Sequence, residues 1–238
     1  NTMIPTRHNG MVPIQLLHPG TILSDNAIVT ATMILDGSNQ SFFNLDKTTV
    51  TGSHKVLYQK RWIYVKDHPD AIAIPHVDGP IYCFNTTSKV IKLHNTVFSD
   101  WDDIEEKDLI TLNDACANNL PEALVFSNIH QNLETGFHPD TIVNMQDGRN
   151  KHMKHIQLGE ILANGEIVTG CVTMQGDVPL YYHQDDIIGT YHLNPVTPPT
   201  TPCTSKSTQL SHILTNTGYL HINNQLYPDY NEGLERFF

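Results

Sequence analysis

The sequence predicts an all-β fold, and three observations support this prediction. Short runs that alternate apolar and polar residues, such as "KVLYQKRWIYV" and "PIYCF", fill residues 42–99 and are typical of strands separated by turns. A β unit occurs twice: "GTILSDNAIVTATM" (residues 20–33) aligns without a gap through "IVT" with "GEILANGEIVTGCVTM" (residues 159–174). Finally, prolines and threonines crowd residues 194–208, which favours an exposed loop between strands.

The repeat also extends upstream. "NTMIPTRHNG" (residues 1–10) aligns with "DTIVNMQDG" (residues 140–148), with one residue fewer in the second connecting turn. We expect each copy to form a strand, a glycine turn, a strand, a "G-x-I-L" strand, a turn and the "IVT" strand. The chain therefore divides into a first half (residues 1–99), a helical connection (residues 100–135) and a second half (residues 136–238).

Residues 99–120 differ in character from both halves. Ser99 or Asp100 is suited to cap a helix, acidic residues fill the first turn, and apolar residues follow at roughly helical spacing. This pattern predicts one inserted helix. The end of the chain predicts three strands separated by an "NTG" and an "NN" turn, and then a short helix from about Asn231 with Asp229 at its N-terminus.

Composition excludes several function classes. The chain has 238 residues, a net charge of −11 and only 14 lysines and arginines, so we expect no nucleic-acid binding. No apolar run approaches the length that a membrane-spanning helix needs, so we expect no membrane span. There is no glycine-rich phosphate loop and no zinc-ligand spacing, so we expect no cofactor and no metal. The four cysteines show no C-x-x-C pair, and most are expected to be small core residues.

One short stretch does not suit a plain strand. Thr51-Gly52-Ser53-His54 interrupts the hydrophobic run "TVTGSHKVLYQKRWIYV", and a glycine gains nothing inside a strand. A turn that presents a histidine to a backbone amide would use these residues. A T-x-x-H pattern alone arises often by chance, but this one follows the repeated unit and precedes the strand of Trp62, which makes the signal stronger.

Together with the "T-(I/M)" and "G-x-I-L" opening, this motif resembles the Hint fold that inteins and hedgehog autoprocessing domains share. Two longer segments, "VTGSHKV…RWIYVKDHPDA…YCFNTTSKVIKLHNTVFSDWDD" and "LTNTGYLHI…PDYNEGLE", look like intein/hedgehog-like proteins encoded by large DNA viruses of algae and protists. The resemblance covers most of the chain, apart from the Pro/Thr-rich loop and parts of the helical connection. It implies a pseudo-twofold horseshoe of short strands.

The resemblance also implies a chemistry. In Hint domains a Cys or Ser at the first position attacks the preceding carbonyl, which is an N-to-S or N-to-O acyl shift. The motif histidine is the general acid, and the threonine helps to hold the peptide bond. Water, a downstream side chain or a sterol then resolves the ester. The candidate catalytic residues are Thr51 and His54, with His212 as a late histidine for the second step and His94-Asn95 as a match to an intein ending.

Each candidate has a simpler alternative. His54 can be an exposed turn histidine, His212 a satisfied strand histidine, and Asn95 a turn residue at the end of a strand. In the first copy the nucleophile would stand four residues before Asn1, outside this sequence, and in the second copy its position holds Gly136. The second copy also lacks T-x-x-H in the usual place. We therefore expect the second copy to be a structural duplicate.

Three functions remain open. The first is self-processing in a single turnover, by backbone cleavage or ligation, with the protein's own upstream polypeptide as the substrate. The second is a catalytically inactive Hint-fold module, for example a virion or surface protein with other virion or surface proteins as partners. The third is a glycan- or protein-binding β domain that uses aromatic side chains, namely Trp62, Tyr64, Trp101, Tyr181 and Tyr182.

Overall fold

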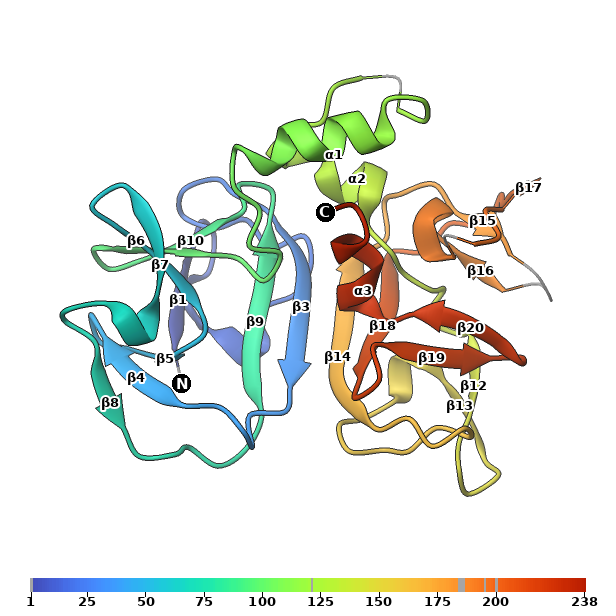
Figure 1. Cartoon of the computed structure of the whole chain (residues 1–238), viewed down its shortest axis with the longest axis horizontal. Coiled ribbons are helices and arrows are strands. Elements are labelled where there is room, and N and C mark those ends of the chain that lie inside the picture. The colour runs from blue at the N-terminus through green and yellow to red at the C-terminus, as the bar shows by residue number, and fades with distance from the viewer. Residues whose placement is uncertain (1, 121, 184–186, 195, 200) are drawn as a thin grey trace.

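The computed structural model describes residues 2–120, 122–183, 187–194, 196–199 and 201–238. Antiparallel sheets dominate it, which confirms the all-β prediction. Figure 1 shows two groups of strands side by side, blue to green for the first half and yellow to red for the second, with the green helices α1 and α2 at one end of both.

The first half contains β1 (Met3–Thr6), β2 (Gly10–Pro13), β3 (Val29–Leu35), β4 (Phe42–Leu45), β5 (Thr48–Thr51), β6 (Lys55–Tyr58), β7 (Arg61–Tyr64), β8 (Ile72–Ile74), β9 (Ile81–Thr86), β10 (Val90–Leu93) and β11 (Thr96–Ser99). The connection contains α1 (Asp108–Cys116) and α2 (Ile129–Leu133). The second half contains β12 (Ile142–Asn144), β13 (Asn150–His152), β14 (Val168–Gln175), β15 (Tyr181–Tyr182), β16 (Ile188–Gly189), β17 (Thr201–Pro202), β18 (Gln209–Thr215), β19 (Tyr219–Ile222), β20 (Gln225–Pro228) and the helix α3 (Tyr230–Glu235).

One four-stranded sheet, in the order β18-β14-β3-β9, joins the two halves. Its centre is the antiparallel pair β3 and β14, which the repeat aligns with each other. The paired residues include Leu35 with Gly170, Met33 with Val172 and Ala31 with Met174. The repeat aligns Ala31 with Gly170 and Leu35 with Met174, so exchanging the halves turns the pair Leu35–Gly170 into the pair Met174–Ala31. An approximate two-fold axis therefore passes between Met33 and Val172.

The duplication is longer than the repeat seen in the sequence. A register shift interrupts both β3–β9 and β14–β18 at the same place, after Val29 and after Val168. Beyond these strands, the backbone N–H of Thr86 donates to Asp100 over 2.9 Å, and that of Thr215 donates to Asp229 over 2.9 Å. Three-stranded sheets also correspond, in the orders β5-β4-β8 and β16-β15-β17. Most of the framework is therefore present twice.

Each half has its own hydrophobic core. Ile4, Val29 and Phe84 lie in the core of the first half, and Val143, Val168 and Ile213 lie at the matching places in the second. A third cluster covers the central sheet, and a fourth packs α1 and α2 against the C-terminal residues. The helices therefore cover the junction of the halves rather than either core.

The predicted helix begins later than expected. Ser99 ends β11, and the carboxylate of Asp100 accepts the N–H of Thr86 instead of capping a helix. This long-range hydrogen bond competes with the local cap and prevails, so α1 begins at Asp108. The C-terminal prediction is confirmed, because Asp229 accepts hydrogen bonds from the first turn of α3. In the Pro/Thr-rich loop, β17 is the strand among the described residues, and residues 195 and 200 lie outside them.

A buried charge cluster lies where the halves meet. Lys89 is 1% exposed, its Nζ lies 3.7 Å from a carboxylate oxygen of Asp100, and it contacts the carboxylate of Asp102. The amide of Asn85 donates to Asp102 over 2.7 Å and to the hydroxyl of Tyr230 over 2.9 Å, so the network reaches the second half. Burial raises the pKa of Asp100 to about 7, and the neighbouring charge of Asp102 acts in the same direction, whereas the charge of Lys89 opposes the shift.

We predict that Lys89→Met destabilises the protein by about 3–5 kcal/mol at pH 8, because it leaves two buried carboxylates without a cation. A carboxyl whose pKa is higher in the folded than in the unfolded state stabilises the fold at low pH, and this contribution is lost as the pH rises through about 7 for Asp100. At pH 5 Asp100 is protonated and needs no cation, so Lys89→Met should reduce the free energy of unfolding by less than at pH 8. Urea unfolding at both pH values measures it.

Lys92→Met is the matched control. Its Nζ lies 3.1 Å from Asp25, but the lysine side chain is 56% exposed, so the loss should be below about 1 kcal/mol. Equal effects of the two substitutions at pH 8 would contradict the prediction.

Candidate functional site

Thr51, Gly52, Ser53 and His54 form the expected turn between β5 and β6. The backbone N–H of His54 donates to the carbonyl of Thr51 over 3.2 Å. A Cβ on Gly52 would lie 2.6 Å from the ring of Phe43 and 2.8 Å from Oγ of Ser41. Glycine is therefore required here by close packing, and the packing fixes Thr51 and His54 relative to the sheet.

His54 is held by the end of β11. Its Nε2 lies 3.0 Å from the carbonyl oxygen of Ser99. A carbonyl only accepts, so Nε2 carries the hydrogen and Nδ1 of the neutral ring has the free lone pair. Burial lowers the pKa of His54 below its ordinary value, although the bond to Ser99 and the charge of Asp103 act in the opposite direction. The ring is therefore neutral at pH 7 and can accept a proton at Nδ1.

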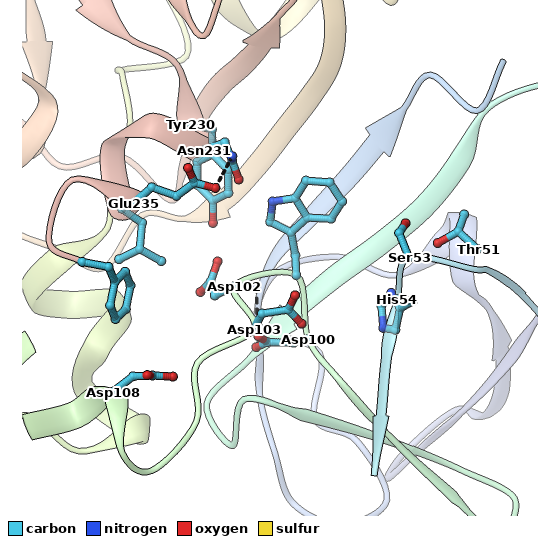
Figure 2. A pocket seen from close by; sticks show the side chains of 13 residues that line it. Thr51, Ser53, His54, Asp100, Asp102, Asp103, Asp108, Tyr230, Asn231 and Glu235 are labelled. Carbon is cyan, nitrogen blue, oxygen red and sulfur yellow. Dashed lines mark hydrogen bonds between the residues drawn. The ribbon is translucent and has the colours of Figure 1, made fainter. Parts of the chain in front are cut away.

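The turn opens into a cavity of about 420 Å³ between the two halves, here called the inter-half cavity. Figure 2 shows Thr51, Ser53 and His54 on one side, and residues of α3 on the other. The lining residues are Thr51, Ser53, His54, Asp100, Trp101, Asp102, Asp103, Asp108, Tyr230, Asn231, Leu234, Glu235 and Phe238.

Acidic side chains dominate the inter-half cavity. Asp100, Asp102 and Asp103 line it together with Asp108 and Glu235. The described residues contain no group of three or more His, Cys, Asp or Glu side chains arranged to hold a metal ion. An acidic lining disfavours anions and suits a neutral or cationic group, such as a peptide backbone with a free amine.

A second cavity, of about 320 Å³, lies on the other side of the same turn. It runs between β5 and β9 and is here called the β5–β9 groove. Thr51, His54 and Trp101 line both spaces. The T-x-x-H residues therefore stand where two cavities meet, and a peptide in the β5–β9 groove would reach them directly.

The second half contains a counterpart of this turn. The N–H of Leu193 donates to the carbonyl of Thr190 over 3.2 Å, which is the bond that His54 makes to Thr51. The backbone N–H of Gly136 donates to Oγ1 of Thr190 over 3.0 Å. The N–H of Thr190 returns a bond to the carbonyl of Gly136 over 3.0 Å. A turn threonine thus holds the peptide bond that precedes Gly136.

The two halves differ at the chemically important positions. Leu193 stands where the first half has His54, and Gly136 has no side chain to act as a nucleophile. Of the motif residues, the threonine is the one present in both halves, as Thr51 and Thr190. The second half therefore retains the backbone arrangement of the site, but without the histidine of the T-x-x-H turn and without a nucleophile at position 136.

His94 and Asn95 lie elsewhere. They form the exposed turn between β10 and β11, where His94 has a φ of 53° and the N–H of Asn95 donates to Asp46 over 2.8 Å. Asn223 and Asn224 form the matching turn of the second half, with φ values of 50° and 63°. Neither His94 nor Asn95 lines the two cavities described above.

His212 belongs to the second half. It is buried in β18, and its ring lies 4.9 Å from that of Phe137, next to Gly136. Burial lowers the pKa of His212 to about 4. The register of the central sheet aligns it with Cys83 of β9. The structure therefore does not bring His212 to Thr51 and His54.

The aromatic candidates do not form one platform. Trp62 and Tyr64 lie on β7 of the first half, and Tyr181 and Tyr182 lie on β15 of the second half. Trp101 lines the inter-half cavity and the β5–β9 groove. A glycan-binding surface would need several of these rings together.

Sequence reasoning did not find the Thr190 turn. The gap-free alignment of Gly20 with Gly159, continued along the chain, places Thr190 opposite Thr51 and Leu193 opposite His54, but no T-x-x-H motif marks the second turn. The signal that could have revealed it is this unchanged spacing, because Thr190 follows Gly159 at the same distance in sequence as Thr51 follows Gly20.

No protein-family model matches the chain, and no curated protein is significantly similar to it. Among the described residues, no helix has both the length and the apolar character that a membrane span requires.

We predict that Gly52→Ala destabilises the fold by about 1–3 kcal/mol, because the added methyl group meets the Phe43 ring and Ser41 in a packed interior. Ser53→Ala is the control, since Ser53 is exposed and should change stability by less than about 0.5 kcal/mol. Urea unfolding of the two variants measures the difference. Equal stability would show that the turn can shift without cost.

We also predict that His54 titrates below its ordinary pKa of 6.5, because burial penalises the charged ring more than Ser99 and Asp103 favour it. NMR titration of the imidazole signals, assigned with His54→Gln, measures this value. An apparent pKa above 6.5 would contradict the prediction and mean that Asp103 dominates.

Proposed function

We propose that the first half is a self-processing domain of the Hint type, in which Thr51 and His54 act on a peptide bond upstream of Thr2. The observation that carries the proposal is the counterpart turn of the second half. There Thr190, which corresponds to Thr51, binds the N–H of Gly136, the position of the nucleophile. Leu193, beside it, occupies the place of His54. By this correspondence, His54 lies next to the peptide bond that Thr51 would hold.

The proposed reaction is an acyl shift at that bond. A Cys Sγ or Ser Oγ at the position of Gly136 attacks the carbonyl carbon of the preceding residue, so that a C–S or C–O bond forms and the amide C–N bond breaks. Nδ1 of His54 takes the proton of the nucleophile and delivers it to the leaving nitrogen. Water then cleaves the ester, releasing a carboxylic acid and restoring the thiol or hydroxyl.

The surroundings of His54 support this role. The carbonyl of Ser99 fixes the orientation of the ring through Nε2, so that Nδ1 remains available. The transient imidazolium would lie near Asp103, whose charge favours it. His54 must be neutral to begin the cycle, so the rate should rise with pH through its lowered pKa and then reach a plateau.

A second function is favoured for the second half. Gly136 and Leu193 remove the chemistry from its site, whereas α3 lines the inter-half cavity opposite His54. We propose that this half is a scaffold that closes the site of the first half. The same observation supports the alternative that the whole chain is a structural module, for example in a virion or at a surface, if the first half also lacks a nucleophile.

The proposal predicts cleavage when a nucleophile is supplied. A reporter protein would be joined to Asn1 through Thr-Cys-Phe-His-Pro, which is the segment of residues 135–139 with Cys in place of Gly. We expect a single cut before the Cys, accelerated by dithiothreitol and seen as the intact mass of the reporter fragment. His54→Ala should slow it about 100-fold or more, since it removes a general acid–base group.

Two controls make the result specific. Replacing the linker Cys by Ala should abolish cleavage, and Gly136→Cys in the second half should give none, because Leu193 provides no proton transfer. An unchanged mass in the presence of thiol would refute self-processing by this site. Cleavage that His54→Ala leaves intact would refute the role of His54.

A further inference from the structure

The imidazole of His130 lies between two hydrogen-bond acceptors. His130 belongs to α2 and is 5% exposed. Its Nδ1 lies 3.0 Å from a carboxylate oxygen of Glu134, and its Nε2 lies 3.0 Å from the backbone carbonyl oxygen of Gln175. A carbonyl and a carboxylate only accept, whereas a neutral imidazole has one N–H and one lone pair. A neutral ring beside an ionised Glu134 therefore leaves one of the two contacts without a hydrogen.

A second hydrogen on the ring satisfies both contacts. It makes His130 an imidazolium that donates through both nitrogens, with Glu134 as its counter-ion. The side chain of Glu134 is 8% exposed, so its carboxylate needs such a cation. Burial alone would raise the pKa of Glu134, but the hydrogen bond and the charge of His130 hold it below its ordinary value, with smaller contributions from Lys89 and Tyr230. The carboxylate is therefore the ionised partner, and the hydrogen belongs to His130.

Charged and titratable groups face this pair from the elements around α2. They are Asp177 after β14, Tyr230 of α3, His212 of β18, and Lys89 and Asp102 of the first half. Asp177 lies 3.7 Å from Nε2 of His130, but its side chain is 54% exposed, so water weakens this contact. Lys89 already serves two carboxylates, so it does not replace His130 as the partner of Glu134.

The same carboxylate joins α2 to α3. The hydroxyl of Tyr230 donates to Glu134 and accepts a hydrogen bond from the amide of Asn85 over 2.9 Å. Next to this contact, a Cβ on Gly233 would lie 2.5 Å from Oγ1 of Thr135, so α3 and the segment after α2 are closely packed. The position of α3 therefore depends on Glu134, and Glu134 depends on His130.

Helix α3 forms one wall of the inter-half cavity. Tyr230, Asn231 and Glu235 line the cavity, and Figure 2 shows them across from His54. A displacement of α3 would change this wall. The hydrogen on His130 is therefore linked to the shape of the cavity through Glu134 and Tyr230.

We propose that His130 and Glu134 form a proton-dependent latch, here called the α2–α3 latch. While the ring of His130 carries two hydrogens, Glu134 remains paired and holds Tyr230, so α3 stays closed on the junction of the halves. When a rising pH removes the hydrogen from Nδ1, a lone pair faces the carboxylate, and Glu134 is left buried without its cation. The charge of Asp102 then repels Glu134 as well, and α3 loosens.

The latch also has an acid limit. Because the pKa of Glu134 is lower in the folded than in the unfolded state, its ionised form stabilises the fold above its ordinary pKa of 4.5. This contribution is lost as the pH falls through the lowered value. The latch therefore closes within a pH window, and it needs neither Thr51 nor a nucleophile, so it goes beyond self-processing.

The first test counts the hydrogens on the His130 ring. We expect ¹⁵N–¹H correlation spectra of the full chain at pH 7, assigned with the double variant His130→Gln/Glu134→Gln, to show hydrogens on both ring nitrogens. In Glu134→Gln the ring should carry one hydrogen, because the Gln amide can donate to Nδ1. A single hydrogen on His130 in the unaltered protein would overturn the proposal. This spectrum decides the question even where a single variant does not fold.

The second test measures the hydrogen-exchange protection of α3, for example at Gly233, whose N–H donates to the carbonyl of Asp229 over 3.0 Å. At pH 7, His130→Gln should lower the protection factor about tenfold or more, because Glu134 is left buried without its cation. Adding Glu134→Gln should restore protection to within about threefold, because two neutral amides can bond each other. Rescue by a second substitution is a result that lost packing alone would not give.

The third test raises the pH. Asp100 also titrates in this network, because burial raises its pKa to about 7, and Glu134→Gln leaves Asp100 in place. In the unaltered protein the protection of α3 should fall together with the Nδ1 hydrogen of His130, and in Glu134→Gln the fall should be smaller. His152→Gln is the matched control, since its side chain is 46% exposed beside Asp140, and should change protection less than about twofold.

Three results would each overturn the latch. They are an unchanged protection factor in His130→Gln, no rescue in the double variant, and the same pH dependence of α3 in Glu134→Gln as in the unaltered protein. Cleavage of the Cys-containing reporter fusion is measured separately, so failure of the latch and failure of self-processing remain distinguishable.

Discussion

The pairing of β3 with β14 is the constraint on which the rest of the structure depends. It places Met33 against Val172 on an approximate two-fold axis and makes one sheet out of strands from both halves. Because each half brings the same framework to that axis, Thr51 and Thr190 take matching positions in the two halves. The inter-half cavity exists because α3 and residues 100–103 meet across this junction.

Duplication has allowed the halves to diverge. The first half keeps a histidine, His54, at its turn. The second half has Leu193 at the corresponding place, and its Phe137 pairs with both Gly189 and Ser211. The second half thus serves as an internal template for the first. The same comparison interprets His94-Asn95 as a hairpin turn, because Asn223-Asn224 forms the matching turn between β19 and β20, and His94 and Asn223 both have a positive φ.

A buried charge cluster, formed by Lys89, Asp100 and Asp102, lies both at the junction of the two halves and next to the His54 site. Asp100 and Asp229 each accept a backbone N–H at the same point of their halves. In the first half alone this point also contains Lys89 and Asp102, and Asn85 extends the network to Tyr230. The stretch that carries these carboxylates also provides the carbonyl that orients His54. Stability at the junction and the geometry of the proposed catalytic group are therefore coupled.

The sequence by itself determined the all-β class, the duplicated unit, the T-x-x-H turn and the capped C-terminal helix, because these follow from local periodicity, turn chemistry and repetition. Only the tertiary structure decided where α1 begins, because Asp100 is recruited by Thr86 of a distant strand. It also placed His212 in the second half, away from His54. These relations depend on strand register across the two-fold axis, which no local pattern records, because it is set by the packing of one half against the other.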